Sequence, residues 1–469
     1  MSRQMQRTQK ARATAEATKG EQNGSGPPRV GVILAAGRSD RMRRATGGSS
    51  KALVRLGGLA LVERTIRTLL SAGLERVVVV VGHQAGPVAA VAHRAAPGRV
   101  HVAYAEDWER GNGASLAAAE VEVPAGELFL LATVDHIFAE GALHALVHAG
   151  GPAVLVDHQP NEAAWGEGTR VRLREERAVA FSKELGDPSI DCGAFLLPTS
   201  VFQAQRTASE RDDDSLAGAV TELAEQVPLA VVPVQEAWWL DIDTPEDLAR
   251  ARRAVRRSLT KDDDGPVSRY LNRPISTRLS MLIAPLRPNP DVLSWLVLGV
   301  GLVAAALLGA GRALAGAALT QIASILDGVD GEIARLQLRA SAGGALLDGV
   351  LDRVCDAAVL GGLALWALRD GEPQTATVVL SIAATGGAML SMAVKDRIRA
   401  LGLPAAPERA LAYLLGGRDG RLLLIALAAL IGKPLVALAA VAATSAIALM
   451  LRVSLVRSWV SRAARSERP

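Results

Sequence analysis

Cysteine is nearly absent from this chain of 469 residues: only Cys192 and Cys355 are present, far apart in the sequence. A disulfide framework and a cysteine-rich zinc site are therefore excluded. A large charge of one sign is also missing, because 52 lysines and arginines stand against 48 aspartates and glutamates, a net charge of +4. So small a surplus predicts no nucleic-acid partner, although a pI of about 9.3 leaves room for local basic patches.

The average composition fits neither an ordinary soluble protein nor a membrane protein throughout. Hydrophobic residues make up 49% of the chain, charged residues make up 21%, and the mean hydropathy is +0.22. This many apolar residues exclude disorder of the whole chain. At about 150 residues per domain the length predicts two to four domains. The intermediate average composition therefore indicates that a more polar half and a more apolar half are joined in one chain.

Changes in composition along the chain mark the expected boundaries. Residues 1–28 are polar and lack the apolar core of a secretory signal, which predicts a disordered tail. We expect a first domain at 29–257, a charged hinge and juxtamembrane segment at 258–288, a transmembrane domain at 289–460 and a C-terminal tail at 461–469. The arginines before the hinge are typical of a solvated face or of a membrane surface.

Apolar runs and helical stretches alternate in the first domain. Helical spacing is clearest at Leu61–Leu70 and Gly141–His148. The apolar runs predict buried strands at Val30–Leu34, Val77–Val81, Val100–Tyr104, Leu128–Thr133, Ala153–Val156 and Ala194–Leu197. This alternation predicts an α/β Rossmann-like domain, with a mostly parallel sheet covered by helices on both faces.

The chain becomes strongly apolar after Pro288. Candidate spans are Val292–Leu308, Ala313–Ile325, Ala345–Leu368, Thr375–Val394, Leu422–Ile431 and Leu435–Leu451. Most reach the roughly 17–25 residues that a spanning helix needs, and the fifth is short. Basic residues of the loops gather on one side, which predicts cytoplasmic termini. We expect an all-α, six-helix transmembrane domain in the cell membrane.

Four aspartates in this apolar half form two helical pairs. Asp327 and Asp330 are three residues apart, and Asp348 and Asp352 are four apart, so each pair lies on one face of its helix. Four unsatisfied carboxylates in a membrane would cost on the order of 10 kcal/mol. Magnesium or manganese would satisfy them, and two such ions suit displacement at phosphorus. Helix capping at the membrane surface is the alternative, which the insertion cost disfavours.

The pattern D-x2-D-G-x2-A-R-x8-G-x3-D-x3-D, which runs from Asp327 to Asp352, resembles the CDP-alcohol phosphotransferase family. Upstream, Asn272-Arg273 and Pro288-Asn289 resemble the entry segment of that family. The resemblance implies a six-helix membrane fold, usually homodimeric through this domain. It also implies a dimetal site open to the cytoplasm, and transfer of a CDP-linked group to an alcohol with release of CMP.

Residue roles follow from this resemblance by position. It implies metal binding by Asp327, Asp330 and Asp348. Asp352 would hold metal or act as the base that takes the acceptor hydroxyl proton. The residues that would line the cytidine nucleotide site are Gly331, Ala334, Arg335 and Gly344.

A small-residue loop follows the first predicted strand. It includes Leu34, Ala35, Ala36 and Gly37, and Arg41 and Lys51 come soon after. Backbone N–H groups of such a loop can cradle phosphates, to which an arginine adds a forked cation. An ordinary strand-to-helix turn is the alternative from these residues alone.

Several features together resemble the nucleotidyltransferases that activate sugar and polyol phosphates. Their signature, L-A-A-G-x-G-x-R-M followed by P-K, is present with Ser39 for the glycine and Ser50 for the proline. The resemblance implies phosphate or charge-stabilising roles for Leu34 to Gly37, Arg41 and Lys51. It also implies a magnesium site at Asp135 and Asp241, with Asp243 in reserve, base recognition near Asn112 and Ser115, and a sugar-phosphate side at Lys183 and Asp191–Ala194.

The remaining candidates have plainer interpretations. His83 and His136 follow strands, and isolated histidines there are more often packing or loop residues than ligands. Cys192 is expected to be a small buried residue rather than a nucleophile, because no histidine partner is near in sequence. Trp238-Trp239 would bury one face of the sheet.

A nucleotidyltransferase-like domain followed by a domain like the CDP-alcohol phosphotransferases resembles a family of bifunctional enzymes that act on inositol phosphate. That likeness implies that CTP and inositol 1-phosphate give CDP-inositol and pyrophosphate. A second inositol 1-phosphate then gives di-myo-inositol phosphate phosphate and CMP. Both sites would be cytoplasmic, and membrane lipid would surround the second half. Two alternatives stay open: the same chemistries making a phospholipid or another polyol phosphodiester, and a nucleotide-sensing membrane scaffold or transporter.

Overall fold

The computed structural model describes residues 26–38, 40–42, 47–139, 141–234, 238–261, 264–401 and 416–466. It consists of two compact units. Unit 1 is Met1–Leu56 with Ala60–Ala251, and unit 2 is Gly57–Leu59 with Arg252–Pro469. Most of the predicted N-terminal tail, the end of the predicted C-terminal tail and Ser39 lie outside the described residues.

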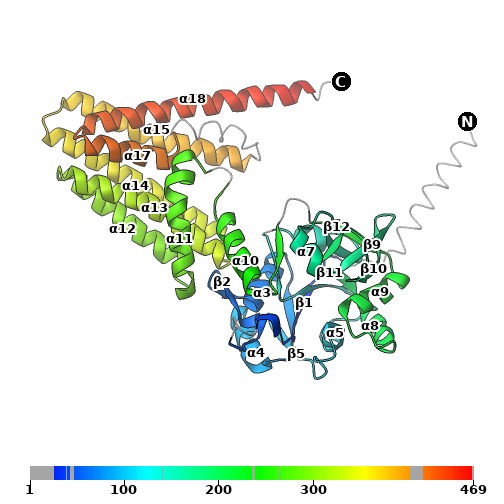
Figure 1. The fold of residues 1–469 in the computed structure, drawn as a ribbon. Coiled ribbons are helices and arrows are strands. Elements are labelled where there is room, and N and C mark those ends of the chain that lie inside the picture. Colours follow the sequence, from blue (N-terminus) through cyan, green and yellow to red (C-terminus); the bar gives the residue numbers. More distant parts are fainter. Residues whose placement is uncertain are drawn as a thin grey trace, which may run out of the picture. The chain divides into compact units, whose positions relative to one another are not determined.

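A nine-stranded sheet forms the centre of unit 1, in the order β5-β4-β1-β6-β11-β8-β12-β10-β9 (Figure 1). The predicted strands are confirmed as β1 (Val30–Ala35), β4 (Arg76–Val81), β5 (Val100–Tyr104), β6 (Leu128–Thr133), β8 (Ala153–Asp157) and β11 (Ile190–Pro198). Strands not predicted are β2 (Arg55–Leu56), β3 (Leu59–Ala60), β7 (His136–Phe138), β9 (Arg170–Arg174), β10 (Arg177–Ser182), β12 (Leu229–Pro233) and β13 (Trp239–Asp241).

The sheet is mixed, so the expectation of a mostly parallel sheet is wrong for its second half, where only β8 and β12 pair in parallel. Strand β1 pairs in parallel with β4 and β6, and β4 pairs in parallel with β5. Strand β11 runs antiparallel to β6 and β8, and β9 and β10 form a hairpin. A parallel crossover needs a dozen or more residues, whereas only residues 175–176 separate β9 from β10.

Helices complete unit 1, and α10 continues from it into unit 2. They are α3 (Leu61–Ser71), α4 (Ala85–Ala95), α5 (Asn112–Ala117), α6 (His144–Val147), α7 (Glu162–Glu167), α8 (Val201–Ser209), α9 (Leu216–Gln226) and α10 (Pro245–Ser258). Of these, α3, α4, α5, α6 and α9 contact strands of the sheet, and α8 packs on α9. Helix α3 confirms the prediction at Leu61–Leu70, while α6 is shorter than predicted. Val77 to Val81 of β4 are fully buried, as expected of a central strand covered on both faces.

Unit 2 is a bundle of helices (Figure 1). Its elements are η4 (Ser268–Asn272), α11 (Arg273–Ile283), α12 (Pro290–Gly309), α13 (Ala313–Leu336), α14 (Ala342–Arg369), α15 (Gln374–Ala400), α17 (Arg418–Leu430) and α18 (Pro434–Ser466). Helices α12 and α14 pack closely, since a Cβ at Gly362 would lie 2.3 Å from the carbonyl oxygen of Ala305. Small residues permit such contacts between membrane helices.

Three helices of the described residues are long and apolar enough to cross a membrane: Pro290–Gly309, Gln374–Ala400 and Pro434–Trp459, with mean hydropathies of 2.3, 1.8 and 2.2. Their large apolar side chains are partly turned outward, and Trp295 and Leu296 of α12 are more than half exposed. An apolar outer surface of this kind indicates association with a membrane. The other predicted spans correspond to α13, α14 and the short α17.

Candidate active sites

In unit 1 several of the predicted site residues lie at the ends of strands, at one edge of the sheet. The loop Leu34–Gly37 leaves β1, and Asp135 follows the neighbouring parallel strand β6. Strand β13 pairs with β7 so that Asp241 lies opposite His136. The carboxyl ends of parallel strands form a common crevice. The structure thus brings Asp135 and Asp241, about a hundred residues apart in sequence, to one place.

Lys51 lies among three carboxylates. Its Nζ is 3.0 Å from Oδ2 of Asp135 and 3.8 Å from Oδ1 of Asp241, and it also contacts Asp243. The residue is only 4% exposed. Burial opposes the charged form, but the three aspartates outweigh it and raise the pKa of Lys51. Ser50, at the usual proline position, accepts a hydrogen bond from the Ala52 N–H and so caps the turn that carries Lys51.

His136 belongs to this cluster, so its interpretation as a packing or loop residue is incomplete. Its Nδ1 lies 2.9 Å from Oδ1 of Asp135 and 2.6 Å from Oγ1 of Thr133, and its ring stacks on Trp239. Gly193 has φ +69°, and a Cβ there would lie 2.7 Å from the His136 ring. Trp239 is buried as predicted, and it also donates a hydrogen bond to Asp157.

The charges of the cluster differ from those of free side chains. Burial disfavours the ionised form of Asp135, but Lys51 and His136 overcome this and hold its pKa well below its usual range. Burial, opposed by His136 and reinforced by Asp135, raises the pKa of Asp241 to about 6. Burial acts against the imidazolium, yet Asp241 and Asp135 raise the pKa of His136 to about 9. Groups with pKa values this far from normal are typical of catalytic sites.

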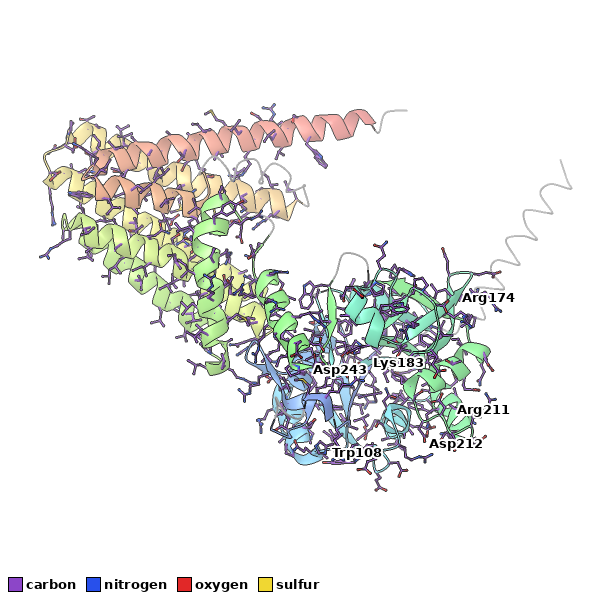
Figure 2. The ribbon with its side chains drawn as sticks, viewed as in Figure 1. Trp108, Arg174, Lys183, Arg211, Asp212 and Asp243 are labelled. Atoms are coloured by element: carbon purple, nitrogen blue, oxygen red, sulfur yellow. The ribbon has the colours of Figure 1, made fainter. Side chains whose placement is uncertain are left out.

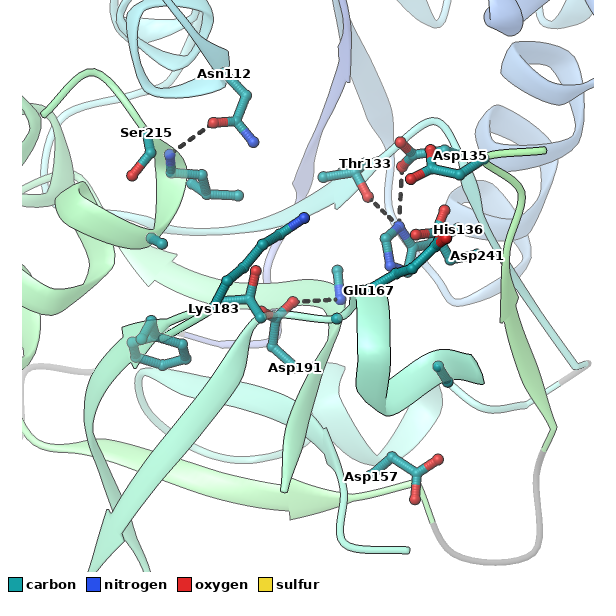
Figure 3. Close-up of a pocket in the computed structure, with 18 of the residues that line it drawn as sticks. Asn112, Thr133, Asp135, His136, Asp157, Glu167, Lys183, Asp191, Ser215 and Asp241 are labelled. Carbon is teal, nitrogen blue, oxygen red and sulfur yellow. Dashed lines mark hydrogen bonds and ion pairs between the residues drawn. The ribbon is translucent and has the colours of Figure 1, made fainter. Parts of the chain in front are cut away.

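Two cavities meet at these residues. One, of about 570 Å³, is lined by the loop Leu34–Gly37, Lys51, Trp108 and Ser115 among others. The second, of about 1050 Å³, is lined by Lys183, Asp191 and Asp241 among others (Figure 3). Both include Asn112, Thr133 and Asp135 in their walls.

The other predicted residues of unit 1 lie around these cavities. Lys183 extends into the larger one (Figure 3), and Figure 2 marks it together with Asp243. Arg41 is exposed, with its Nη1 3.2 Å from Oδ2 of Asp243. Asn112 uses its Oδ1 to accept from the Leu216 N–H at 2.7 Å, which fixes the start of α9.

The donors at this edge fit a divalent cation. Ligand atoms of Asp135, His136 and Asp241 lie within 4.8 Å of one another. Oδ1 of Asp241 is buried and, within the described part of the chain, accepts no hydrogen bond. Carboxylate oxygens are the ligands that magnesium and manganese prefer, and a buried oxygen without a donor is satisfied by such an ion.

In unit 2 the aspartates of α13 and α14 converge. Carboxylate oxygens of Asp327, Asp348 and Asp352 lie within 4.8 Å of one another, a donor set that fits a hard divalent cation. Asp330 is engaged elsewhere, because its Oδ2 accepts from the Ser294 hydroxyl of α12 and its Oδ1 from the Gly331 N–H at 2.5 Å. Three of the four predicted carboxylates therefore form one cluster.

The sequence argument missed Arg418, the first residue of α17. Its Nη1 lies 2.5 Å from Oδ1 of Asp327 and 3.0 Å from Oδ1 of Asp352, and its Nε is 3.0 Å from Asp356. Asp356 also accepts from Arg421 at 3.3 Å. Arg418 was not singled out from the sequence. Its position at the start of an apolar helix was the available signal.

The predicted nucleotide-side residues of unit 2 lie at the facing ends of α13 and α14. Gly331 lies beside Arg335, whose Nη2 donates to the Leu259 carbonyl at 3.1 Å. Ala334 is on the same turn of α13. The Gly344 N–H donates to the Ser341 hydroxyl at 3.0 Å, which caps the start of α14.

Two family models match the chain. The MobA-like NTP transferase domain matches residues 31–190, and the CDP-alcohol phosphatidyltransferase matches residues 288–414. The chain therefore consists of a nucleotidyltransferase domain followed by a helical CDP-alcohol phosphotransferase domain.

Relatives with both domains extend over most of the chain. The bifunctional IPC transferase and DIPP synthase of Rubrobacter xylanophilus is 38% identical over 417 residues, which cover 88% of this chain and 93% of the relative. The protein of the same name from Thermococcus kodakarensis is 34% identical over 401 residues, covering 85% and 89%. The solved inositol-1-phosphate CTP transferase from T. maritima is similar to unit 1, with 23% identity and a TM-score of 0.44, and covers 49% of this chain and 98% of that one. This chain belongs to the family of bifunctional IPC transferases and DIPP synthases.

Proposed function

We propose that the chain catalyses two consecutive reactions. In unit 1 a phosphate oxygen of inositol 1-phosphate attacks the α-phosphorus of CTP, and pyrophosphate leaves. In unit 2 a hydroxyl of a second inositol 1-phosphate attacks the phosphorus of CDP-inositol that carries the inositol. CMP leaves, the hydroxyl proton passes to a base, and di-myo-inositol phosphate phosphate forms. CDP-inositol is the compound that the two units share.

One observation carries the first half of this proposal: the two cavities of unit 1 meet at Asp135. The smaller cavity has the phosphate-loop residues in its wall, and the larger has Lys183. A nucleotide in the first and a polyol phosphate in the second would face each other across the carboxylates. Holding two reactants in this way can supply about 7–11 kcal/mol toward the barrier.

The side chains of unit 1 then have distinct roles. Arg41 and Lys51 would stabilise charge on the triphosphate as pyrophosphate leaves. Lys183 would position the attacking phosphate, with Asn112 and Ser115 on the base side. Asp135 and Asp241 would hold a magnesium or manganese ion, which when bound neutralises charge on the reacting phosphates.

The carboxylates of unit 2 serve the transfer. Asp327, Asp330 and Asp348 would hold up to two divalent ions, which when bound offset the charge of the pyrophosphate group. Asp352 either joins them or takes the proton of the attacking hydroxyl. Gly331, Ala334, Arg335 and Gly344 would line the cytidine nucleotide.

The membrane arrangement is also part of the proposal. Six helices, α12 to α15, α17 and α18, would span the cell membrane, with both termini and both sites in the cytoplasm. The three long apolar helices support this, and so do the ion pairs of Arg418 with Asp327 of α13 and Asp352 of α14. A homodimer would form through unit 2.

The test is to incubate the purified full chain with CTP, magnesium and inositol 1-phosphate and to identify the products by mass. We expect pyrophosphate, CDP-inositol, CMP and a product with two inositols, and none of them in excess EDTA. Parallel reactions offer glycerol 3-phosphate in place of inositol 1-phosphate, or a lipid acceptor together with CDP-inositol. Turnover confined to these arms would contradict the proposed substrates, and absence of CTP turnover in all arms would contradict the activity.

A further inference from the structure

Two adjacent side chains at the entry to unit 2 are buried together. Asn272 ends η4 and is 3% exposed, and Arg273 opens α11 with a side chain that is 12% exposed. The Arg273 N–H bonds to the Ser268 carbonyl, an i→i+5 bond that makes η4 a π-helical turn. Such widened turns alter the direction of neighbouring side chains and are frequent at functional sites. This turn allows both residues to face the interior.

Asn272 connects η4 to two helices. Its Nδ2 donates to the Ser324 hydroxyl of α13 at 3.0 Å and to Oδ1 of Asp419 in α17 at 3.1 Å. Its Oδ1 accepts from Nε2 of Gln321 at 3.0 Å. Asp419 is the neighbour of Arg418, which contacts the carboxylate cluster. The amide therefore fixes α13 and the start of α17 relative to each other.

Arg273 is held from two sides. Its Nε and Nη2 donate to Asp264 at 2.9 and 3.0 Å, and its Nη1 donates to Oε1 of Glu332 in α13 at 2.7 Å. Glu332 is fully buried, and the hydroxyls of Ser276 and Ser280 donate to it at 2.7 and 2.6 Å. A buried carboxylate is tolerated when it is satisfied in this way. This network connects the segment before η4 to α13.

The guanidinium lies next to the carboxylate-bearing turn itself. A Cβ at Gly328, between Asp327 and Asp330, would lie 2.5 Å from Nη1 of Arg273. A larger residue at 328 would therefore displace the guanidinium of Arg273. The guanidinium thus packs against the backbone that carries the first aspartate pair.

We propose that Asn272 and Arg273 are positioning residues for the transfer reaction. They fix the Asp327–Asp330 turn of α13 against the start of α17, and Asp264 and Glu332 fix Arg273. The juxtamembrane segment is then a working part of the transfer site and not only a connection between domains. The inference rests on the proposed transfer in unit 2. Loss of such a supporting contact commonly reduces metal affinity or activity about 10–100-fold.

Gly328→Ala tests this with the least disturbance. The added methyl displaces the guanidinium while every hydrogen-bonding group remains, and alanine favours a helix. Gly299→Ala in α12, where nothing lies within 4 Å of the added Cβ, is the matched control. Arg273→Lys keeps the positive charge, but a lysine ammonium lacks the planar guanidinium that donates to Asp264 and Glu332 at the same time. Arg278→Gln, at an exposed position of the same helix, controls for loss of a surface charge.

The full chain in detergent is given CDP-inositol and inositol 1-phosphate, and CMP release is followed as magnesium is varied. Gly328→Ala and Arg273→Lys should release CMP about 10–100-fold more slowly and need more magnesium for half-maximal rate. Both should keep pyrophosphate release from CTP. Mn²⁺ binding is measured by EPR, and the Asp327→Asn variant identifies the signal of the Mn²⁺ site in unit 2. In Gly328→Ala and Arg273→Lys, this site should bind Mn²⁺ more weakly. Both controls should match the wild type.

A purely structural role would reduce the amount of folded protein and leave the magnesium requirement and Mn²⁺ affinity unchanged, which would overturn the inference. Wild-type rates in both variants would overturn it as well. If the wild-type chain itself releases no CMP from CDP-inositol, the proposed transfer fails instead. The two failures are therefore distinguishable.

Discussion

At the scale of single residues, we propose that Lys51 is the cation on which the first reaction depends. It is buried, and it contacts Asp135 and Asp243, while the phosphate loop lies in the same cavity wall. Lys51→Ala should reduce formation of CDP-inositol by about 10²–10³-fold, the usual cost of removing one preorganised electrostatic contact. Pyrophosphate release from CTP and inositol 1-phosphate measures this.

Supplying CDP-inositol to the Lys51→Ala chain should restore CMP release and the two-inositol product, because unit 2 is unchanged. Arg174 is an exposed arginine, labelled in Figure 2, that is not among the residues lining the two cavities, so Arg174→Ala should behave as the wild type. A variant that still fails when CDP-inositol is supplied would show that the two sites are not separate.

Spacing along one helix was enough to predict the aspartate pairs of unit 2, because helical periodicity is local. The partners of those pairs were not predictable in the same way. Arg418 is 91 residues after Asp327 by number, and Asp243 is 192 residues after Lys51. Neither distance leaves a periodic signal in the sequence. His136 was beside a predicted ligand, but its contacts with Thr133 and Trp239 depend on strand pairing.

At the scale of elements, the β9–β10 hairpin contains local strain. Glu175 and Glu176 turn it with φ of 50° and 59°, a conformation that costs non-glycine residues about 1–2 kcal/mol each. Asn-Gly is the preferred pair for such a turn. Glu175→Asn with Glu176→Gly should raise Tm by about 2–4 °C for each kcal/mol gained. Glu176→Ala does not relieve the backbone and should not raise Tm, and an equal rise in both variants would contradict the explanation.

A second element-scale prediction concerns the outer face of α12. Val303 is 53% exposed in a helix with a mean hydropathy of 2.3. An arginine near the middle of a spanning helix costs about 2.5–3.5 kcal/mol on insertion scales. Val303→Arg should therefore reduce the fraction of protein recovered in the membrane, while Val303→Leu should not. Equal recovery of the two variants would count against lipid contact on this face.

Continuous apolar runs predicted the parallel strands well, because strands buried on both faces contain few polar residues. The β9–β10 hairpin escaped prediction for a physical reason. Strand β9 alternates arginine with apolar residues, β10 begins with an arginine, and the turn between them lacks the glycine or asparagine that usually marks such loops. The hairpin, which Lys183 follows, and the antiparallel direction of β11, which carries Asp191, therefore became visible only in the structure.

At the scale of the whole molecule, the two compact units predict separable activities. A fragment that ends at Leu259 retains all of α10 and the buried side chain of Val255. It should be soluble and release pyrophosphate from CTP and inositol 1-phosphate at the rate of the full chain. Pyrophosphate assays on the two proteins compare them directly. A folded fragment without activity would contradict independent sites.

The central claim is that CDP-inositol made in unit 1 is consumed at the carboxylate cluster of unit 2. Asp352→Asn in the full chain tests it most directly, because the change keeps the side-chain shape while removing a charge and a proton acceptor. With CTP and inositol 1-phosphate, this variant should release pyrophosphate normally and accumulate CDP-inositol. It should release CMP at least about 10²–10⁴-fold more slowly than the wild type. CMP release at the wild-type rate would contradict the assignment of the cluster as the transfer site.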